Sequence, residues 1–150
     1  MIQKAAVHFF ILSLWAAPIV AQSVAKGPKV YDPAAETSIS GTILQVVSAV
    51  GPDGAVGVHL TLKTTGTTVK VHLGPAVFIG MNNFSFMAED LVAVRGAYVW
   101  HDGEVAMWAR QVTKRSETLT LRSEDGTPRW PFATADDPDG CGIAHAPIRY

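Results

Sequence analysis

Two histidines, His59 and His72, are the residues whose type and spacing point most clearly to chemistry. They lie in the segment Val56–Leu73, where VGVHLTLK and TVKVHL flank a Thr-Thr-Gly-Thr turn. Both runs alternate apolar and polar residues, which is typical of a half-buried antiparallel strand pair. A two-residue turn at Thr65-Gly66 would place His59 opposite His72 on the outer face of this hairpin.

Such a pair could share a metal ion. Opposite Cβ atoms in this position are roughly 5 Å apart, and imidazole is a good ligand for Zn²⁺ and Cu²⁺. A specific site would need a third ligand from elsewhere. Lys63 and Lys70 lie on the same face, and their positive charges oppose cation binding. Three interpretations stay open: a solvated strand face, a metal site at His59 and His72, or a weak site for an anion or polar ligand.

Other patterns are weaker. Cys141 and His145 have the spacing of half a metal site, but the chain has a single cysteine, so we expect no structural zinc site there and no internal disulfide. The sequence contains neither a G-x-S-x-G nucleophile motif nor a glycine-rich phosphate loop. We therefore expect a protein that is not an enzyme.

The elements that position the histidines are short strands. Within the hairpin, the register predicts inward pairs Leu62 with Val69, Leu60 with Val71 and Val58 with Leu73. Leu91–Trp100 and Glu104–Thr113 predict a second hairpin with Asp-Gly at its tip. Its core side is expected to hold Val92, Val94, Gly96, Tyr98, Val105, Met107 and Ala109.

Trp108 falls on the other side of that hairpin, opposite Ala97. Packing is one interpretation of this side chain, and contact with a peptide, a glycan or a partner protein is the other. Lys63, Lys70 and Trp108 are accordingly the candidate binding residues besides the histidine pair.

The remaining segments complete a small barrel. Thr37–Val50 predicts a first strand with a bulge or a sharp coil at Gly41, and Thr118–Arg122 predicts a last strand. Pro75–Asp90 fits a plug between the third and fourth strands, with one helical turn at Ala76–Met81. We predict an all-β fold, a small five- to six-stranded OB-like barrel with a short helical or loop plug.

Four pieces of sequence support this fold: VKVHLGP at Val69–Pro75, DLVAVRG at Asp90–Gly96, the Ala109-Arg110 pair, and LTLRSEDGTPRW at Leu119–Trp130. Together they resemble a group of small exported bacterial OB-fold proteins over about Thr37–Trp130. The shared pattern is a strand ending in LGP followed by a closing L-x-L-R-x-x-x-G-x-P-x-W. The resemblance implies the fold but no substrate or catalytic residue.

The two ends of the sequence predict the domain boundaries and the cellular compartment of the protein. Residues 1–21 have the charged start, apolar run and small-residue cleavage positions of a signal peptide. This predicts export to the periplasm or secretion, and no membrane span after cleavage. We expect a flexible linker at 22–36, the barrel at 37–132, and a disordered or loosely packed tail at 133–150.

Charge narrows the choice of partner. Loss of Lys4 with the leader leaves 11 basic against 13 acidic residues, which disfavours an oligonucleotide binder because phosphate neutralisation needs a basic surface. The sequence thus favours a non-enzymatic exported binding or accessory module, with an unknown protein or small ligand as its partner. A periplasmic metal-binding protein using His59 and His72, with Zn²⁺ or Cu²⁺, is the alternative.

Overall fold

The computed structural model describes residue 28 and residues 30–50, 54–101 and 103–131. This part of the chain is almost entirely β-structure. Its elements in chain order are η1 (Pro33–Ala35), β1 (Thr37–Val50), β2 (Val56–Lys63), β3 (Thr68–Pro75), α1 (Ala76–Met81), β4 (Leu91–His101), β5 (Glu104–Lys114) and β6 (Glu117–Thr120). The predicted signal peptide and the predicted tail lie outside the described residues.

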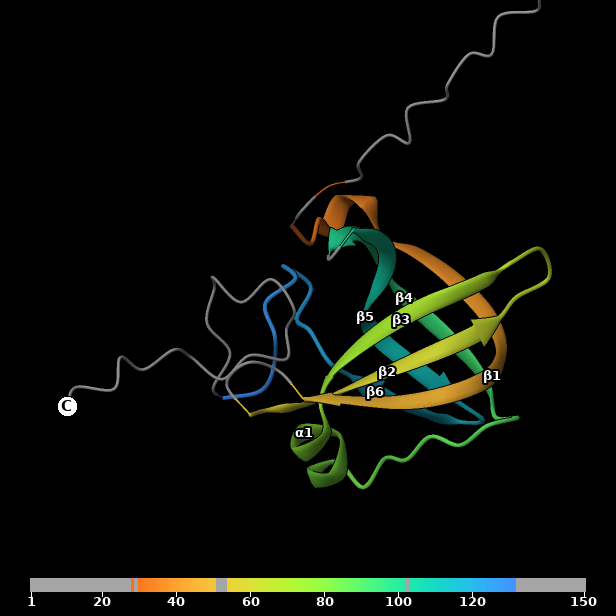
Figure 1. Cartoon of the computed structure of the whole chain (residues 1–150). Helices are drawn as coiled ribbons and strands as arrows, with labels where there is room; N and C mark the ends of the chain where they lie inside the picture. The colour runs from red at the N-terminus through yellow and green to blue at the C-terminus, as the bar shows by residue number, and fades with distance from the viewer. Residues whose placement is uncertain (1–27, 29, 51–53, 102, 132–150) are drawn as a thin grey trace, which may run out of the picture.

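The strands close into a barrel. Their order in the sheet is β3-β2-β1-β4-β5-β6, and a short parallel pairing of β3 with β5 closes five of them into a ring (Figure 1). The last strand, β6, pairs with β5 outside this ring. The structure confirms the predicted all-β barrel with a short helix between the third and fourth strands.

The first hairpin has the predicted register over most of its length. Leu60 pairs with Val71, and His59 pairs with His72. The expected pairing of Val58 with Leu73 is wrong, because a bulge between Val58 and His59 moves the partner of Val58 to Gly74. This bulge lies directly beside the histidine pair, and the pairing of His59 with His72 is the predicted one.

The second hairpin confirms the pairing of Ala97 with Trp108. Val105 was expected in the core, but its side chain is 45% exposed. It lies near the tip of the hairpin, opposite Trp100, beyond the stretch where β5 begins to pair with β3 at Met107. Val105 therefore has no barrel interior to enter.

The first strand also departs from prediction at one point. The bulge expected at Gly41 occurs between Ile43 and Gln45 instead. Gly41 serves a different purpose, because a Cβ atom there would lie 2.5 Å from the carbonyl oxygen of Lys63. The glycine allows β1 and the end of β2 to approach closely.

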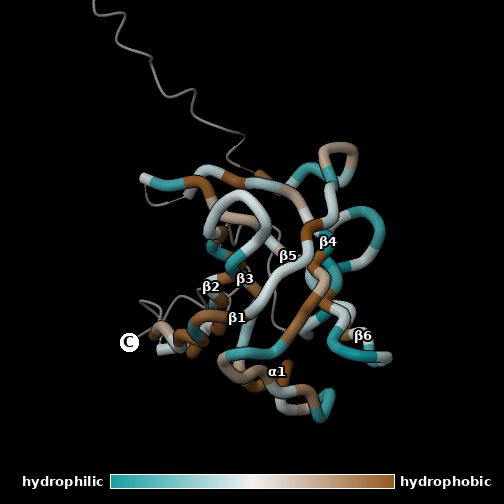
Figure 2. Tube along the Cα trace, turned by 90° about the vertical axis from the view of Figure 1, so that its right-hand side faces the viewer, coloured by the Kyte–Doolittle hydropathy of each residue, from teal (hydrophilic) through white to brown (hydrophobic). Residues whose placement is uncertain are grey.

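Aliphatic side chains fill the barrel. The most deeply buried include Ile43, Leu60, Leu62, Val71, Val94 and Met107. Figure 2 shows hydrophilic residues concentrated in the loops and at strand ends, with hydrophobic stretches along strands and in α1. The interior is therefore a packed core.

One end of the barrel is closed by α1 and Trp130. Ile79 of α1 is buried in the core, and the Phe78 ring lies 5.7 Å from the Trp130 ring, centroid to centroid. Gly74 has a φ of +137°, and a Cβ atom there would lie 2.7 Å from the Trp130 ring. This position therefore requires glycine both for its backbone and for the close approach of the indole.

The segment before β1 is attached to the barrel, although the sequence places it in a linker. Asp32 caps η1 by accepting a hydrogen bond from the Ala34 backbone N–H. Glu36 pairs with arginines of β4 and β5. Among the described residues, no helix has the length and apolar character needed to cross a membrane.

Candidate functional site

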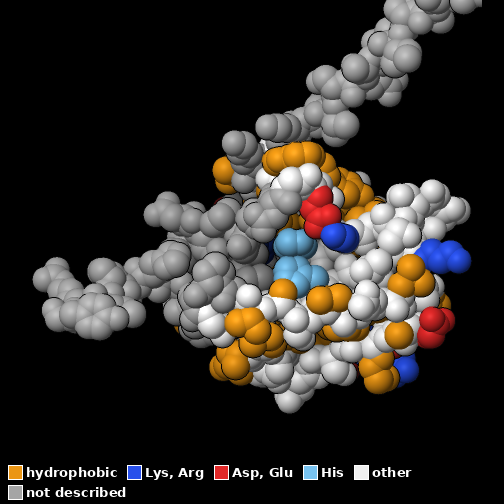
Figure 3. Space-filling view, in the orientation of Figure 1, with side chains coloured by type: hydrophobic (Ala, Val, Ile, Leu, Met, Phe, Trp, Pro, Cys, Tyr) orange, Lys and Arg blue, Asp and Glu red, His pale blue; other side chains and the backbone are white. Residues whose placement is uncertain are grey.

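The histidine pair lies on the outer face of the first hairpin. The His59 and His72 ring centroids are 4.2 Å apart, and the ring planes meet at 81°. Both side chains are partly exposed. Figure 3 shows the two pale-blue histidines side by side on this face, next to one acidic and one basic side chain. The structure thus brings together the two residues that the sequence pairs.

Trp108 lies next to His72, across the parallel β3–β5 pairing that closes the barrel. It pairs with His72 where β5 meets β3, and the two rings are stacked with centroids 6.3 Å apart and planes 16° apart. The indole is only 2% exposed. Trp108 therefore supports His72 from behind, and a ligand at this face would meet the imidazoles first.

The two lysines of the face differ in their surroundings. Lys70 forms an ion pair with Glu104 of β5, with an Nζ–Oε2 distance of 2.6 Å. Lys63 is exposed at the far end of β2, opposite Thr68. The carboxylate of Glu104 offsets the nearer positive charge. The term histidine face is used below for His59, His72, Lys70 and Glu104.

The described residues place two imidazole side chains, those of His59 and His72, at this face. Within them, no group of three or more His, Cys, Asp or Glu side chains is placed to hold a metal ion. Cys141 and His145 lie outside the described residues. The third ligand that the sequence analysis requires is therefore not contributed by the described part of the barrel.

Sequence reasoning missed an aromatic cage around Arg122. Its guanidinium carbon lies 5.1 Å from the Tyr31 ring, 5.2 Å from the Trp108 ring and 5.5 Å from the Trp130 ring, measured to the centroids. The residue is 4% exposed, and its Nη1 donates to the Gly126 carbonyl over 3.1 Å. Cation–π contacts of this kind stabilise a desolvated guanidinium. The three rings come from distant parts of the chain, so no local pattern could reveal the cage.

A second missed cluster is centred on Glu36. Its carboxylate accepts hydrogen bonds from Tyr31 Oη at 2.7 Å, Arg110 Nε at 2.7 Å and Arg95 Nε at 2.8 Å. Burial alone would raise the pKa of Glu36, but these three donors together hold it below its ordinary value of 4.5. Burial, and then the bond to Glu36, raise the pKa of Tyr31. The four residues are called the Glu36 cluster below.

Comparison with known proteins places the chain in a family. The model of the MamS/MamX magnetosome protein family matches residues 35–119, more than half of the sequence. The match begins at η1 and ends within β6, so it spans the whole barrel ring, whereas most of the closing pattern at Leu119–Trp130 lies beyond it. No curated protein matches the sequence significantly. The chain therefore belongs to the MamS/MamX magnetosome protein family.

Proposed function

We propose that the chain is a non-enzymatic, exported binding module that serves at the magnetosome and binds a transition-metal ion through His59 and His72. The observation that carries this proposal is the contact of the two imidazole rings on the outer face of the barrel, with centroids 4.2 Å apart. Rings at this separation can direct nitrogen atoms at a common ion. Family membership supports the setting, and the predicted signal peptide supports export.

The electrostatics of the histidine face favour a cation more than the sequence alone suggested. The pairing of Lys70 with Glu104 offsets the positive charge nearest to the imidazoles. Stacking on Trp108 limits the orientations open to His72, which lowers the entropy lost when a metal binds. The remaining ligands would be water or groups of another molecule, as suits an open site.

Calorimetric titration of the metal-free exported chain, made without a histidine tag, tests this proposal. Cu²⁺ and Zn²⁺ should each give a saturable heat that disappears in the His59→Ala, His72→Ala double variant. Thr61→Ala is the matched control, since Thr61 lies on the same face of β2, and its heat should equal that of the wild type. Equal heats for the wild type and the double variant would dispose of the metal site.

The pH dependence provides an independent test. Metal binding requires neutral imidazole, whose ordinary pKa is about 6.5. The affinity should therefore fall as the pH is lowered through this range, and the double variant should show no such dependence.

Oligonucleotide binding is disfavoured by the excess of acidic residues.

A further inference from the structure

Two cavities lie beside β6, and neither lining contains a histidine. The first has a volume of about 330 Å³ and is lined by Arg110, Gln111, Thr120, Arg122, Ser123, Glu124 and Arg129. The second, of about 270 Å³, is lined by Phe78, Asn82, Phe84, Thr118, Leu119, Thr120 and Arg129. Thr120 and Arg129 belong to both linings, so the two cavities meet at these residues.

The first cavity gathers positive charge. Arg110 and Arg122 are both buried, and each is held in place: Arg110 Nε donates to Glu36, and Arg122 Nη1 donates to Gly126. Arg129 is exposed, and among the described residues its side chain forms no ion pair. Among the described residues, the carboxylates beside these guanidinium groups are Glu124, in the lining, and Glu36, already bonded to three donors.

The polar lining of this cavity suits an oxyanion. Thr120 and Ser123 contribute hydroxyl groups, and Gln111 contributes an amide that already donates to the Thr120 hydroxyl over 3.4 Å. Guanidinium groups bind phosphate and carboxylate oxygens in pairs, with a geometry that lysine cannot offer. Arg110 and Arg122 are held in place, whereas Arg129 is exposed. The Arg129 side chain can therefore move to contact a ligand bound beside the other two arginines.

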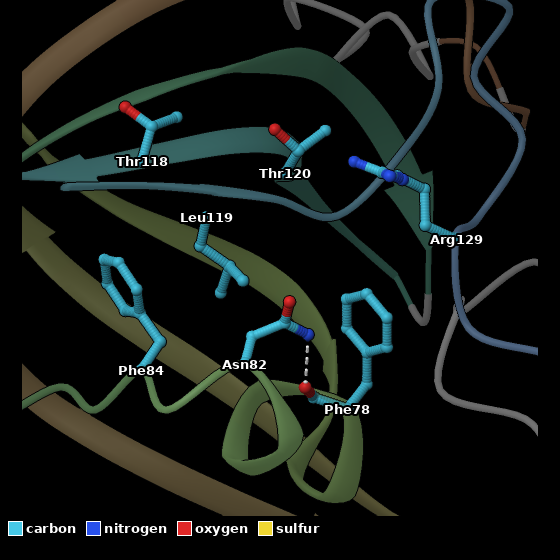
Figure 4. Close-up of a pocket in the computed structure, with 7 residues that line it drawn as sticks. All are labelled: Phe78, Asn82, Phe84, Thr118, Leu119, Thr120 and Arg129. Carbon is cyan, nitrogen blue, oxygen red and sulfur yellow. Dashed lines mark hydrogen bonds between the residues drawn. The ribbon is translucent and has the colours of Figure 1, made fainter.

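The second cavity places three apolar side chains, Phe78, Phe84 and Leu119, in a lining that is otherwise polar and includes the same arginine. Figure 4 shows Phe78 and Phe84 at opposite ends of this cavity, with Leu119 between them and Arg129 beyond Phe78. Asn82 is held at its floor by a 2.8 Å hydrogen bond from its side-chain amide to the Phe78 carbonyl. The apolar side chains can accept a ring or a short alkyl chain.

We infer that these cavities form one binding site for a small organic oxyanion. Its phosphate or carboxylate group lies against Arg129 and Arg110, and its apolar body lies in the cavity between Phe78 and Phe84. The site is separate from the histidine face and needs no metal ion. The first cavity alone would accept any oxyanion, and the second alone would accept any small apolar group. Because Arg129 lines both cavities, together they favour a ligand that carries both groups.

Titration of the full exported chain with phenylphosphate and with inorganic phosphate at low ionic strength, followed by calorimetry and by NMR amide shifts, tests this inference. Phenylphosphate should bind about tenfold more tightly than phosphate, because burial of the ring adds an apolar contribution. Arg129→Gln should weaken binding of both probes about tenfold. Arg115→Gln, at an exposed arginine of the β5–β6 turn outside both linings, should leave both affinities unchanged.

Further variants separate the halves of the site and separate it from the metal proposal. Phe84→Leu should weaken only phenylphosphate, and the histidine double variant should bind both probes like the wild type. Absence of saturable binding, equal affinities for the two probes, or an Arg129→Gln variant that binds like the wild type would overturn the inference. Each of these results leaves the Cu²⁺ and Zn²⁺ titration unaffected.

Discussion

The Glu36 cluster and the histidine face are two polar groups built on the outside of the same barrel, and they differ in how completely they are enclosed. Glu36 and Arg110 have side chains that are 5% and 9% exposed, and each partner is matched by a donor or acceptor. Lys70 of the histidine face has a side chain that is 56% exposed, and the imidazoles beside it are partly open to solvent.

This difference separates a structural role from a binding role. Burying a charge is costly unless it is paired and hydrogen-bonded, so the buried Glu36 and Arg110 stabilise the fold only as a pair, which fastens the end of η1 to β5. Arg95 of β4, whose side chain is 55% exposed, adds a more exposed bond to the same carboxylate. The histidine face carries no such requirement, since water can solvate its groups. Disruption of the first cluster should affect stability, and disruption of the second should affect binding.

The largest expected effect is that of Glu36→Ala. Removing this carboxylate leaves the buried guanidinium of Arg110 without its anion, a change that typically costs about 3–5 kcal/mol. Urea unfolding of both proteins should show this loss. A difference below about 1 kcal/mol would mean that the cluster behaves like a surface ion pair.

Leu60→Ala supplies a reference for a purely apolar loss beneath the histidine face. Leu60 is almost fully buried in the core, so truncation should cost about 2–5 kcal/mol. Thr61→Ala, one residue along on the outer side of β2, should change stability by no more than about 0.5 kcal/mol. If chemical denaturation gave equal losses of stability for the two variants, Leu60 would not face the core while Thr61 faces outward.

Acid should weaken the Glu36 cluster. Because the three donors hold the folded-state pKa of Glu36 below 4.5, its contribution to stability is present above about pH 4.5 and is lost as the pH falls through the folded-state value. Asp90, whose pKa is lowered by the Met87 backbone N–H and by Lys114, adds to the same trend. Thermal melts between pH 6 and pH 3 should therefore fall less steeply for Glu36→Gln than for the wild type.

The smallest expected effect on stability is that of Lys70→Ala. The Lys70–Glu104 pair is solvent-exposed, and such pairs contribute about 0–1 kcal/mol. The same substitution should leave Glu104 unpaired near the imidazoles and so strengthen metal binding slightly. If urea unfolding showed a loss of more than about 2 kcal/mol in the free energy of unfolding, the Lys70–Glu104 pair would stabilise the fold much as the Glu36 cluster does.

The sequence predicted best where a local pattern determines the structure. Alternation from Val58 to Leu73 was sufficient to pair Leu60 with Val71 and His59 with His72, because side-chain period and turn length together fix the register. The short helix Ala76–Met81 followed from a Pro-terminated strand and an apolar run. The bulge between Val58 and His59 escaped prediction because the alternation of apolar and polar residues continues through it in both strands.

What could not be predicted depends on contacts between distant segments. Glu36 lies in a stretch without periodicity, and only the folded structure brings it against Arg110, a residue 74 positions further along. The cage of Arg122 likewise combines rings from three separate segments. Composition gives no sign of such pairings, which is why the segment before β1 was interpreted as a linker.

Titration of the metal-free chain with Cu²⁺, in parallel with the His59→Ala, His72→Ala variant, directly tests whether the two imidazoles bind a metal ion. We expect a saturable heat for the wild type that is absent from the double variant and present in Thr61→Ala. A heat of the same size in the double variant, or none in any of the three proteins, would contradict a binding role for the histidine face.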